Sequence, residues 1–251
     1  MDTIIGLGQA GCNIADEFRK HSQYKIYKID ASDDSDQNDW SWASYDLESE
    51  VSVFERSGVC NILRQPGAEE YEKNCPTLNF LKDIKGEVLF IVGGAGDISG
   101  ASLSILEQLK HCSISILYIR PDINALNLIK SRQEWVTFNV LQEYTRSGIF
   151  KRIYLIDNLQ IEKHLENVPV IGYYDKLNNM IVSLLHMINV YDHIGSVIDT
   201  FSNPPQGCRI STIGFYDSEL HENKLFYLLD NVKEIRYYYA INKKKLETDS
   251  D

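Results

Sequence analysis

Long apolar runs are missing from this 251-residue sequence. No window approaches the roughly 18 uncharged apolar residues that a membrane-spanning helix needs. The first residues, MDTIIGLGQAG, contain neither a basic segment nor a long apolar one. We therefore expect neither a membrane span nor a signal peptide.

Cysteine and basic residues are also scarce. The five cysteines are an odd number and include no CxxC pair, which argues against a disulfide framework. We expect reduced thiols and a cytoplasmic protein. Lys and Arg together number 25 against 36 Asp and Glu, for a net charge of −11. Because binding a phosphate backbone needs clustered Lys and Arg, we expect no nucleic-acid partner.

Common catalytic and metal-binding motifs are absent as well. None of the six histidines shows HxxxH or HExxH spacing, and there is no GxSxG segment. The sequence therefore lends no support to a histidine-based metal site or to a serine nucleophile.

Short apolar segments alternate along the chain with segments of helical periodicity. The expected strands are 3–5, 24–29, 87–92, 113–119 and 152–156, and the expected helices are 13–19, 101–110, 125–130, 135–145 and 174–191. This alternation is typical of an α/β fold, in which helices cover both faces of a mostly parallel sheet. We expect a Rossmann-like domain over 1–173, a connecting helix over 174–194 and a reduced C-terminal α+β subdomain over 195–251. The last part is expected to contain strands at 210–215 and 235–241 and a helix at 219–230.

The first expected strand runs into a complete GxGxxG loop, Gly6-Leu7-Gly8-Gln9-Ala10-Gly11, which precedes a helix. Glycine lets the backbone approach a phosphate, and the following helix offers free N–H groups. Asp30 ends the next strand, nineteen residues after Gly11. A dinucleotide-binding protein has the same arrangement, with the acid on the ribose, so this loop alone leaves NAD open as a ligand.

A second glycine loop, Gly93-Gly94-Ala95-Gly96-Asp97-Ile98-Ser99-Gly100, also follows a strand and opens a helix. In parallel sheets, ligands bind at the carboxyl ends of the strands. Two such loops in one sheet predict a single nucleotide whose phosphates are held from two sides.

The ordered set of motifs resembles the tubulin/FtsZ superfamily, across roughly residues 3 to 200. GLGQAGCNIAD is similar to the opening loop of FtsZ and of CetZ-like proteins, IDASD to the family's second loop, and GAGDISGA to its GGGTGTGA signature. Ile119-Arg120-Pro121 resembles the strand-ending RP, and Leu155-Ile156-Asp157-Asn158 resembles IPN. Leu177-Asn178 lies where the family's central helix begins.

This resemblance implies a GTP- or GDP-binding protein with Mg²⁺ that self-associates head to tail. The residues that match the family's nucleotide contacts are Gly8, Gln9, Ala10, Gly11, Asn13, Asp30, Gly94, Ala95, Gly96, Asp97, Ile98, Ser99, Gly100, Asn158 and Asn178. Asp97 would hold the metal. Asp199, in the loop after the central helix, would be the catalytic acid that completes the site of a neighbouring subunit.

The sequence departs from the family pattern at three points. Asp97 and Ile98 replace a Thr and a Gly of the signature, Asp199 stands in an incomplete acidic pattern, and the C-terminal part is short. A carboxylate beside a phosphate repels it unless a cation lies between them. Two alternatives therefore remain open: a tubulin-like structural subunit that does not hydrolyse nucleotide, and an NAD-binding Rossmann protein.

Overall fold

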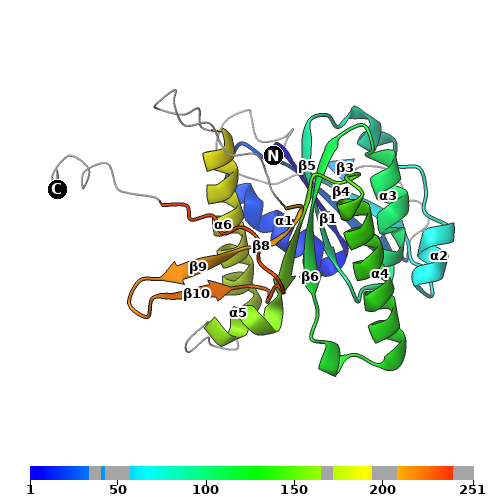
Figure 1. Ribbon diagram of the computed structural model, residues 1–251. Helices are drawn as coiled ribbons and strands as arrows, with labels where there is room; N and C mark the ends of the chain where they lie inside the picture. The colour runs from blue at the N-terminus through cyan, green and yellow to red at the C-terminus, as the bar shows by residue number, and fades with distance from the viewer. Residues whose placement is uncertain (34–40, 43–56, 165–171, 194–207, 240–251) are drawn as a thin grey trace.

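The computed structural model describes residues 1–33, 41–42, 57–164, 172–193 and 208–239 (Figure 1). An eight-stranded sheet has the order β3-β4-β2-β1-β5-β6-β7-β8. Only the two-residue β3 pairs antiparallel, with β4, and the other pairings in this sheet are parallel. The strands are β1 (Thr3–Leu7), β2 (Lys25–Ser32), β3 (Ser41–Trp42), β4 (Ser57–Leu63), β5 (Glu87–Gly93), β6 (Ser113–Arg120), β7 (Arg152–Asp157) and β8 (Ile210–Thr212). The predicted α/β, Rossmann-like fold is confirmed.

Helices cover both faces of this sheet. One face carries α1 (Gly8–Glu17), α5 (Asn158–His164) and α6 (Tyr173–His193), and the other carries α2 (Ala68–Lys73), α3 (Ser102–Gln108) and α4 (Leu128–Arg146). Successive strand side chains enter opposite cores: Ile4 packs with the α1 and α6 side, and Ile5 with the α3 and α4 side. Strands buried on both faces need continuous apolar runs, which is why these segments could be recognised in the sequence.

The strand order reverses between β1 and β5. The chain moves from β1 outward to β2 and β4, and then returns to place β5 on the other side of β1. This reversal is the topological switch point of an open α/β sheet, where ligands commonly bind. The two glycine loops follow β1 and β5, so both lie at this point, at the carboxyl edge of the sheet.

Several segments differ from the sequence predictions. Residues 128–146 form one helix, α4, in place of the two helices expected at 125–130 and 135–145, because no breaker interrupts the residues between them. In place of the helix expected at 219–230, β9 (Gly214–Asp217) and β10 (Glu222–Leu225) form an antiparallel hairpin. His221 takes a positive φ of 55° in its turn, so that the short polar segment reverses direction.

The rest of the C-terminal region follows the sequence only in part. The strand expected at 210–215 is divided between β8, which extends the main sheet beside β7, and β9. Residues 235–239 form no strand, and residues 240–241 lie outside the described part of the chain. The boundary expected at residue 195 stays a prediction. Within the described ranges, no helix is long and apolar enough to cross a membrane.

Candidate functional site

The first glycine loop joins β1 directly to α1. Gly8 has a φ of +69°, which favours glycine, and α1 begins at this residue. A methyl group on Gly6 would lie 2.4 Å from the carbonyl oxygen of Gly11, and one on Gly11 would lie 2.5 Å from that of Ile91. Those two glycines therefore let α1 pack closely on β1 and β5. No side chain caps the start of α1, so its first-turn N–H groups can meet an anion.

The two middle residues of this loop, Gln9 and Ala10, are exposed. Their backbone lies in the first turn of a ten-residue helix, where the helix dipole favours negative charge. The geometry of the loop therefore fits the phosphate contact that the sequence predicts for it.

In the second loop, some glycines are required because neighbouring atoms leave no room for a side chain, and another is not. A methyl group on Gly94 would lie 1.9 Å from the Tyr118 hydroxyl oxygen, and one on Gly100 would lie 2.0 Å from the carbonyl oxygen of Ala68. Because Gly94 and Gly100 have no side chain, β6 and α2 can pack closely against this loop. Gly96, by contrast, is exposed, and its nearest neighbour would be 3.9 Å from an added methyl group. The open backbone of this loop is therefore around Gly96.

The two loops meet through Ile98. A methyl group on Gly8 would lie 2.7 Å from Ile98 Cγ2, and Ile98 is only 8% exposed. The branched side chain of Ile98 thus fills space directly against the first loop. This contact brings the two predicted phosphate loops together and also narrows the space between them.

Helix α4 holds the second loop with side chains on one face. Lys130 Nζ donates to Asp97 Oδ1, and Gln133 Nε2 donates to the carbonyl oxygen of Gly96 at 2.6 Å and to Ser99 Oγ at 3.3 Å. Ser99 Oγ in turn donates to the carbonyl oxygen of Gly94 at 3.4 Å. Because Lys130 and Gln133 are three residues apart, they project from adjacent turns toward the loop.

The expected metal ligand, Asp97, therefore already has a cationic partner. Its side chain is 43% exposed and that of Lys130 is 29% exposed, so the ion pair lies at the surface of the loop. Within the described residues, no group of three or more His, Cys, Asp or Glu side chains could hold a metal ion. The donor set around Asp97 does not fit a metal site built by the protein.

A buried acid next to the second loop was not predicted from the sequence. Glu134 is 3% exposed, accepts a hydrogen bond from the Tyr118 hydroxyl at 3.0 Å and lies 3.8 Å from Arg120 Nε. Burial and the charge of Glu134 raise the pKa of Tyr118, so its phenol remains a donor. Arg120 also donates to the Tyr227 hydroxyl at 3.2 Å. The predicted RP motif thus contributes its arginine to a buried network at the end of β6.

The other predicted contacts are spread around the same edge. Asn158 begins α5 directly after β7, while Asn13 is exposed on α1 and Asn178 is partly buried on α6. Asp30 lies near the end of β2, where its Oδ1 accepts from the N–H of Ala31 at 2.8 Å. The structure brings the two glycine loops into direct contact. Asp199 lies outside the described residues.

Cys12, just beyond the first loop, is a packing residue. Its Sγ donates to the carbonyl oxygens of Gly6 at 3.5 Å and Ile29 at 3.6 Å. Burial, with a smaller effect of the Asp30 charge, raises the pKa of the Cys12 thiol to about 12. The thiol therefore stays protonated and is a poor nucleophile at neutral pH.

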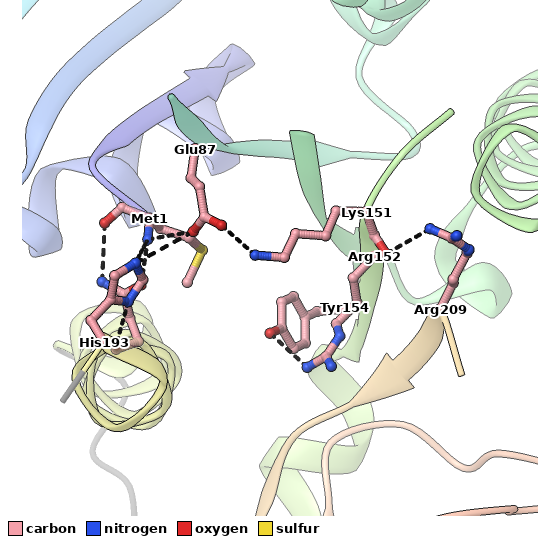
Figure 2. A network of polar contacts seen from close by, with 8 residues as sticks. Met1, Glu87, Lys151, Arg152, Tyr154, His193 and Arg209 are labelled. Atoms are coloured by element: carbon pink, nitrogen blue, oxygen red, sulfur yellow. Dashed lines mark hydrogen bonds and ion pairs between the residues drawn. The ribbon is translucent and has the colours of Figure 1, made fainter. Parts of the chain in front are cut away.

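The opposite, amino edge of the sheet carries a polar network of a different kind (Figure 2). The Met1 ammonium donates to Glu87 Oε2 at 2.9 Å and to Asn189 Oδ1 at 2.6 Å, and Lys151 pairs with the other oxygen of Glu87. His193 lies beside this cluster, with its Nδ1 2.7 Å from the Asn189 carbonyl oxygen. The network ties α6 to the start of β5 and stabilises the fold away from the glycine loops.

Comparisons with known proteins show the fold and leave the family open. No protein-family model matches the sequence, and no curated protein does. Among solved structures, the chain is similar to an empty FtsZ dimer from M. jannaschii, with a TM-score of 0.50 and 12% identity over 78% of this chain and 56% of that chain. It is also similar to a tail-truncated TubZ from Clostridium botulinum phage c-st, with a TM-score of 0.48 and 15% identity over 75% and 60%.

This chain therefore spans less than two thirds of the length of these FtsZ and TubZ chains. A short-chain dehydrogenase/reductase from Saccharomyces cerevisiae is less similar, with a TM-score of 0.38 and 11% identity over 88% of this chain and 98% of that chain. The similarity to FtsZ supports a tubulin/FtsZ-like α/β fold for this protein.

Proposed function

We propose that this protein binds a guanine nucleotide, with the phosphates held between the two glycine loops at the switch point. The observation that carries this proposal is the contact between the loops: Gly8 and Ile98 meet where the strand order reverses. A parallel sheet concentrates ligand sites at such a point. The resemblance of the ordered motifs to the tubulin/FtsZ superfamily favours guanine.

Each part of the site would have a distinct task. The first-turn N–H groups of Gln9 and Ala10 would receive phosphate oxygens, and the exposed backbone at Gly96 would meet them from the other side. Asn13, Asn158 and Asn178 would contact the base or the ribose, as the family resemblance implies. Asp97 could bind Mg²⁺ only if Lys130 released it.

Assembly and hydrolysis form a further part of the proposal. By the same resemblance, copies of the chain would associate head to tail, and Asp199 of one copy would position water at the nucleotide of the next. The FtsZ structure to which this fold is similar is that of a dimer. Turnover that survives Asp199→Ala unchanged would remove Asp199 from this role.

The first experiment is to identify the nucleotide. Freshly purified protein is denatured, and the released small molecules are separated by anion-exchange chromatography; GTP, ATP and NAD are then titrated into nucleotide-free protein. We expect GDP or GTP in the supernatant and selective binding of GTP. Selective NAD binding would move the chain to the dinucleotide-binding class, and no binding of any of the three would leave a structural subunit.

A charge variant tests the location of the site without harming the fold. Gln9→Glu adds a carboxylate to the first turn of α1, which the helix dipole favours, but it places this charge where the phosphates would bind. We expect unchanged or higher thermal stability together with binding at least about tenfold weaker, a loss of about 1.4 kcal/mol. Gln142→Glu makes the same change in the C-terminal half of α4 and should leave binding unchanged.

A further inference from the structure

The ion pair between Asp97 and Lys130 replaces a neutral part of the family signature. The resemblance places a Thr where this chain has Asp97, so the loop carries an extra negative charge where phosphate would bind. Within the structure that charge is met by Lys130, from a helix that begins at Leu128. The backbone of Lys130 is fixed, because its N–H donates to the capping side chain of Asn127 at 2.9 Å.

The surroundings keep this pair in place at the loop. Gln133, one turn further along α4, holds the carbonyl oxygen of Gly96 and the hydroxyl of Ser99, the residues that flank Asp97 and Ile98. The loop backbone therefore presents the Asp97 carboxylate to Lys130. Both side chains remain partly exposed, so a ligand at Gly96 can reach them.

We propose that Lys130 supplies, in place of a divalent cation, the positive charge that lets a phosphate bind beside Asp97. This inference rests on the proposed nucleotide site and deepens it: binding would not require Mg²⁺. A lysine ammonium has three donors, so it can keep one hydrogen bond to Asp97 and direct the others to phosphate oxygens.

The alternative, Mg²⁺ on Asp97, requires the ion to displace an ammonium group that is already tethered to the protein. Mg²⁺ also dehydrates reluctantly and usually needs one or two carboxylates in addition to phosphate oxygens. Asp97 is the one acid in residues 93–100, and its charge is already compensated. Lys130 is therefore better placed than a metal ion to bridge this loop and a phosphate.

The test measures GTP binding by isothermal titration calorimetry, in excess MgCl₂ and in excess EDTA. We expect the wild-type dissociation constant to differ less than about threefold between the two buffers, because no divalent ion contributes. Lys130→Gln should weaken binding at least about tenfold in EDTA, with partial recovery in MgCl₂. Lys130→Arg should retain most of the affinity.

Two further variants separate a charge role from a structural one. Asp97→Asn combined with Lys130→Gln removes both charges and should regain affinity over Lys130→Gln alone, which the loss of a merely structural contact would not allow. Lys151→Gln removes a lysine that is also ion-paired, but at the amino edge of the sheet, and should bind like the wild type. Thermal melting verifies that each variant is folded.

The outcomes distinguish this inference from the proposed function. If wild-type protein binds GTP only with Mg²⁺ and Lys130→Gln binds equally well, the inference is overturned, Asp97 returns to the metal role and the nucleotide site stands. If wild-type protein binds no GTP in either buffer, both proposals are overturned.

Discussion

Ile98 packs directly against Gly8, so that a methyl group added to Gly8 would lie 2.7 Å from Ile98 Cγ2. The contact joins two loops that are 90 residues apart in the sequence, and it places an apolar side chain at the centre of the proposed phosphate site. Because the two residues are in contact, substitutions at Gly8 and Ile98 should have coupled effects on the stability of the protein.

Gly8→Ala should destabilise the protein for two reasons. The positive φ of Gly8 costs a residue with a Cβ about 1–2 kcal/mol, and the contact with Ile98 adds a steric cost. Ile98→Ala should relieve the second cost and not the first. In a double-mutant cycle measured by urea unfolding, we expect the double variant to be at least about 1 kcal/mol more stable than the sum of the single effects. Additive single effects would show that the two residues do not interact.

Glu134→Ala should cost far more stability than the same change at Glu143 on the same helix. Glu134 is buried against Tyr118 and Arg120, and its removal takes away the side-chain acceptor of the Tyr118 hydroxyl and the acidic partner of the Arg120 guanidinium. We expect the free energy of unfolding to fall by about 2–4 kcal/mol. This is somewhat less than the loss of about 3–5 kcal/mol that is typical for breaking a fully buried ion pair, because Arg120 is partly exposed. Glu143 pairs with Arg146 at the surface, where such pairs contribute at most about 1 kcal/mol. Equal losses in chemical denaturation would contradict the buried network.

Glu87 should make the protein less stable in acid. Burial alone would raise its pKa, but hydrogen bonds from Lys151 and the Met1 ammonium, together with their charges, lower it from 4.5 to about 2. A depressed pKa adds stability that is complete above the unfolded value, so this contribution is lost as the pH falls from about 4.5 to about 2.

The measurement for Glu87 is the unfolding free energy of wild type and Glu87→Gln across this pH range. The variant should be less stable at neutral pH and should show a shallower decline in acid. A decline as steep as that of the wild type would assign the acid sensitivity to other carboxylates.

The stacked imidazoles of His21 and His186 should weaken the protein at mildly acidic pH. Their ring centroids are 3.6 Å apart; burial lowers the pKa of both, with added repulsion from Lys20 on His21 and from His21 on His186. The unfolded chain therefore takes up protons at a higher pH than the folded chain, and stability falls as the pH drops below the ordinary value of 6.5.

The effect of this histidine pair is measured as the melting temperature between pH 8 and pH 5, a range chosen to bracket the ordinary histidine pKa of about 6.5. His186→Asn should flatten the dependence, while His221→Asn, at the exposed turn of the β9–β10 hairpin, should leave it unchanged. An unaltered profile in His186→Asn would show that the pair is not the cause.

Several elements could be predicted because their reason is local. The strands at 87–92, 113–119 and 152–156 are continuous apolar runs, as parallel strands buried on both faces must be, and the structure confirms them within one or two residues. The long helix predicted at 174–191 is α6, because its apolar residues recur with helical spacing. The glycine loops are also local: Gly8 has the positive φ that favours glycine, and Gly96 has open space around it.

The α/β class, the two loops at the carboxyl edge and the central helix therefore follow from the amino-acid sequence, since hydrophobic periodicity and glycine spacing are patterns over a few residues. Only the fold shows that Lys130 reaches Asp97, that Glu134 is buried while the adjacent Trp135 is exposed, and that Ile98 fills the space beside Gly8. The C-terminal hairpin also depends on the fold, because its two short strands are held by pairing with each other. These relationships depend on which elements the fold places side by side. Contacts between residues that are far apart in the chain produce no periodic pattern in the sequence, so they could not be predicted from it.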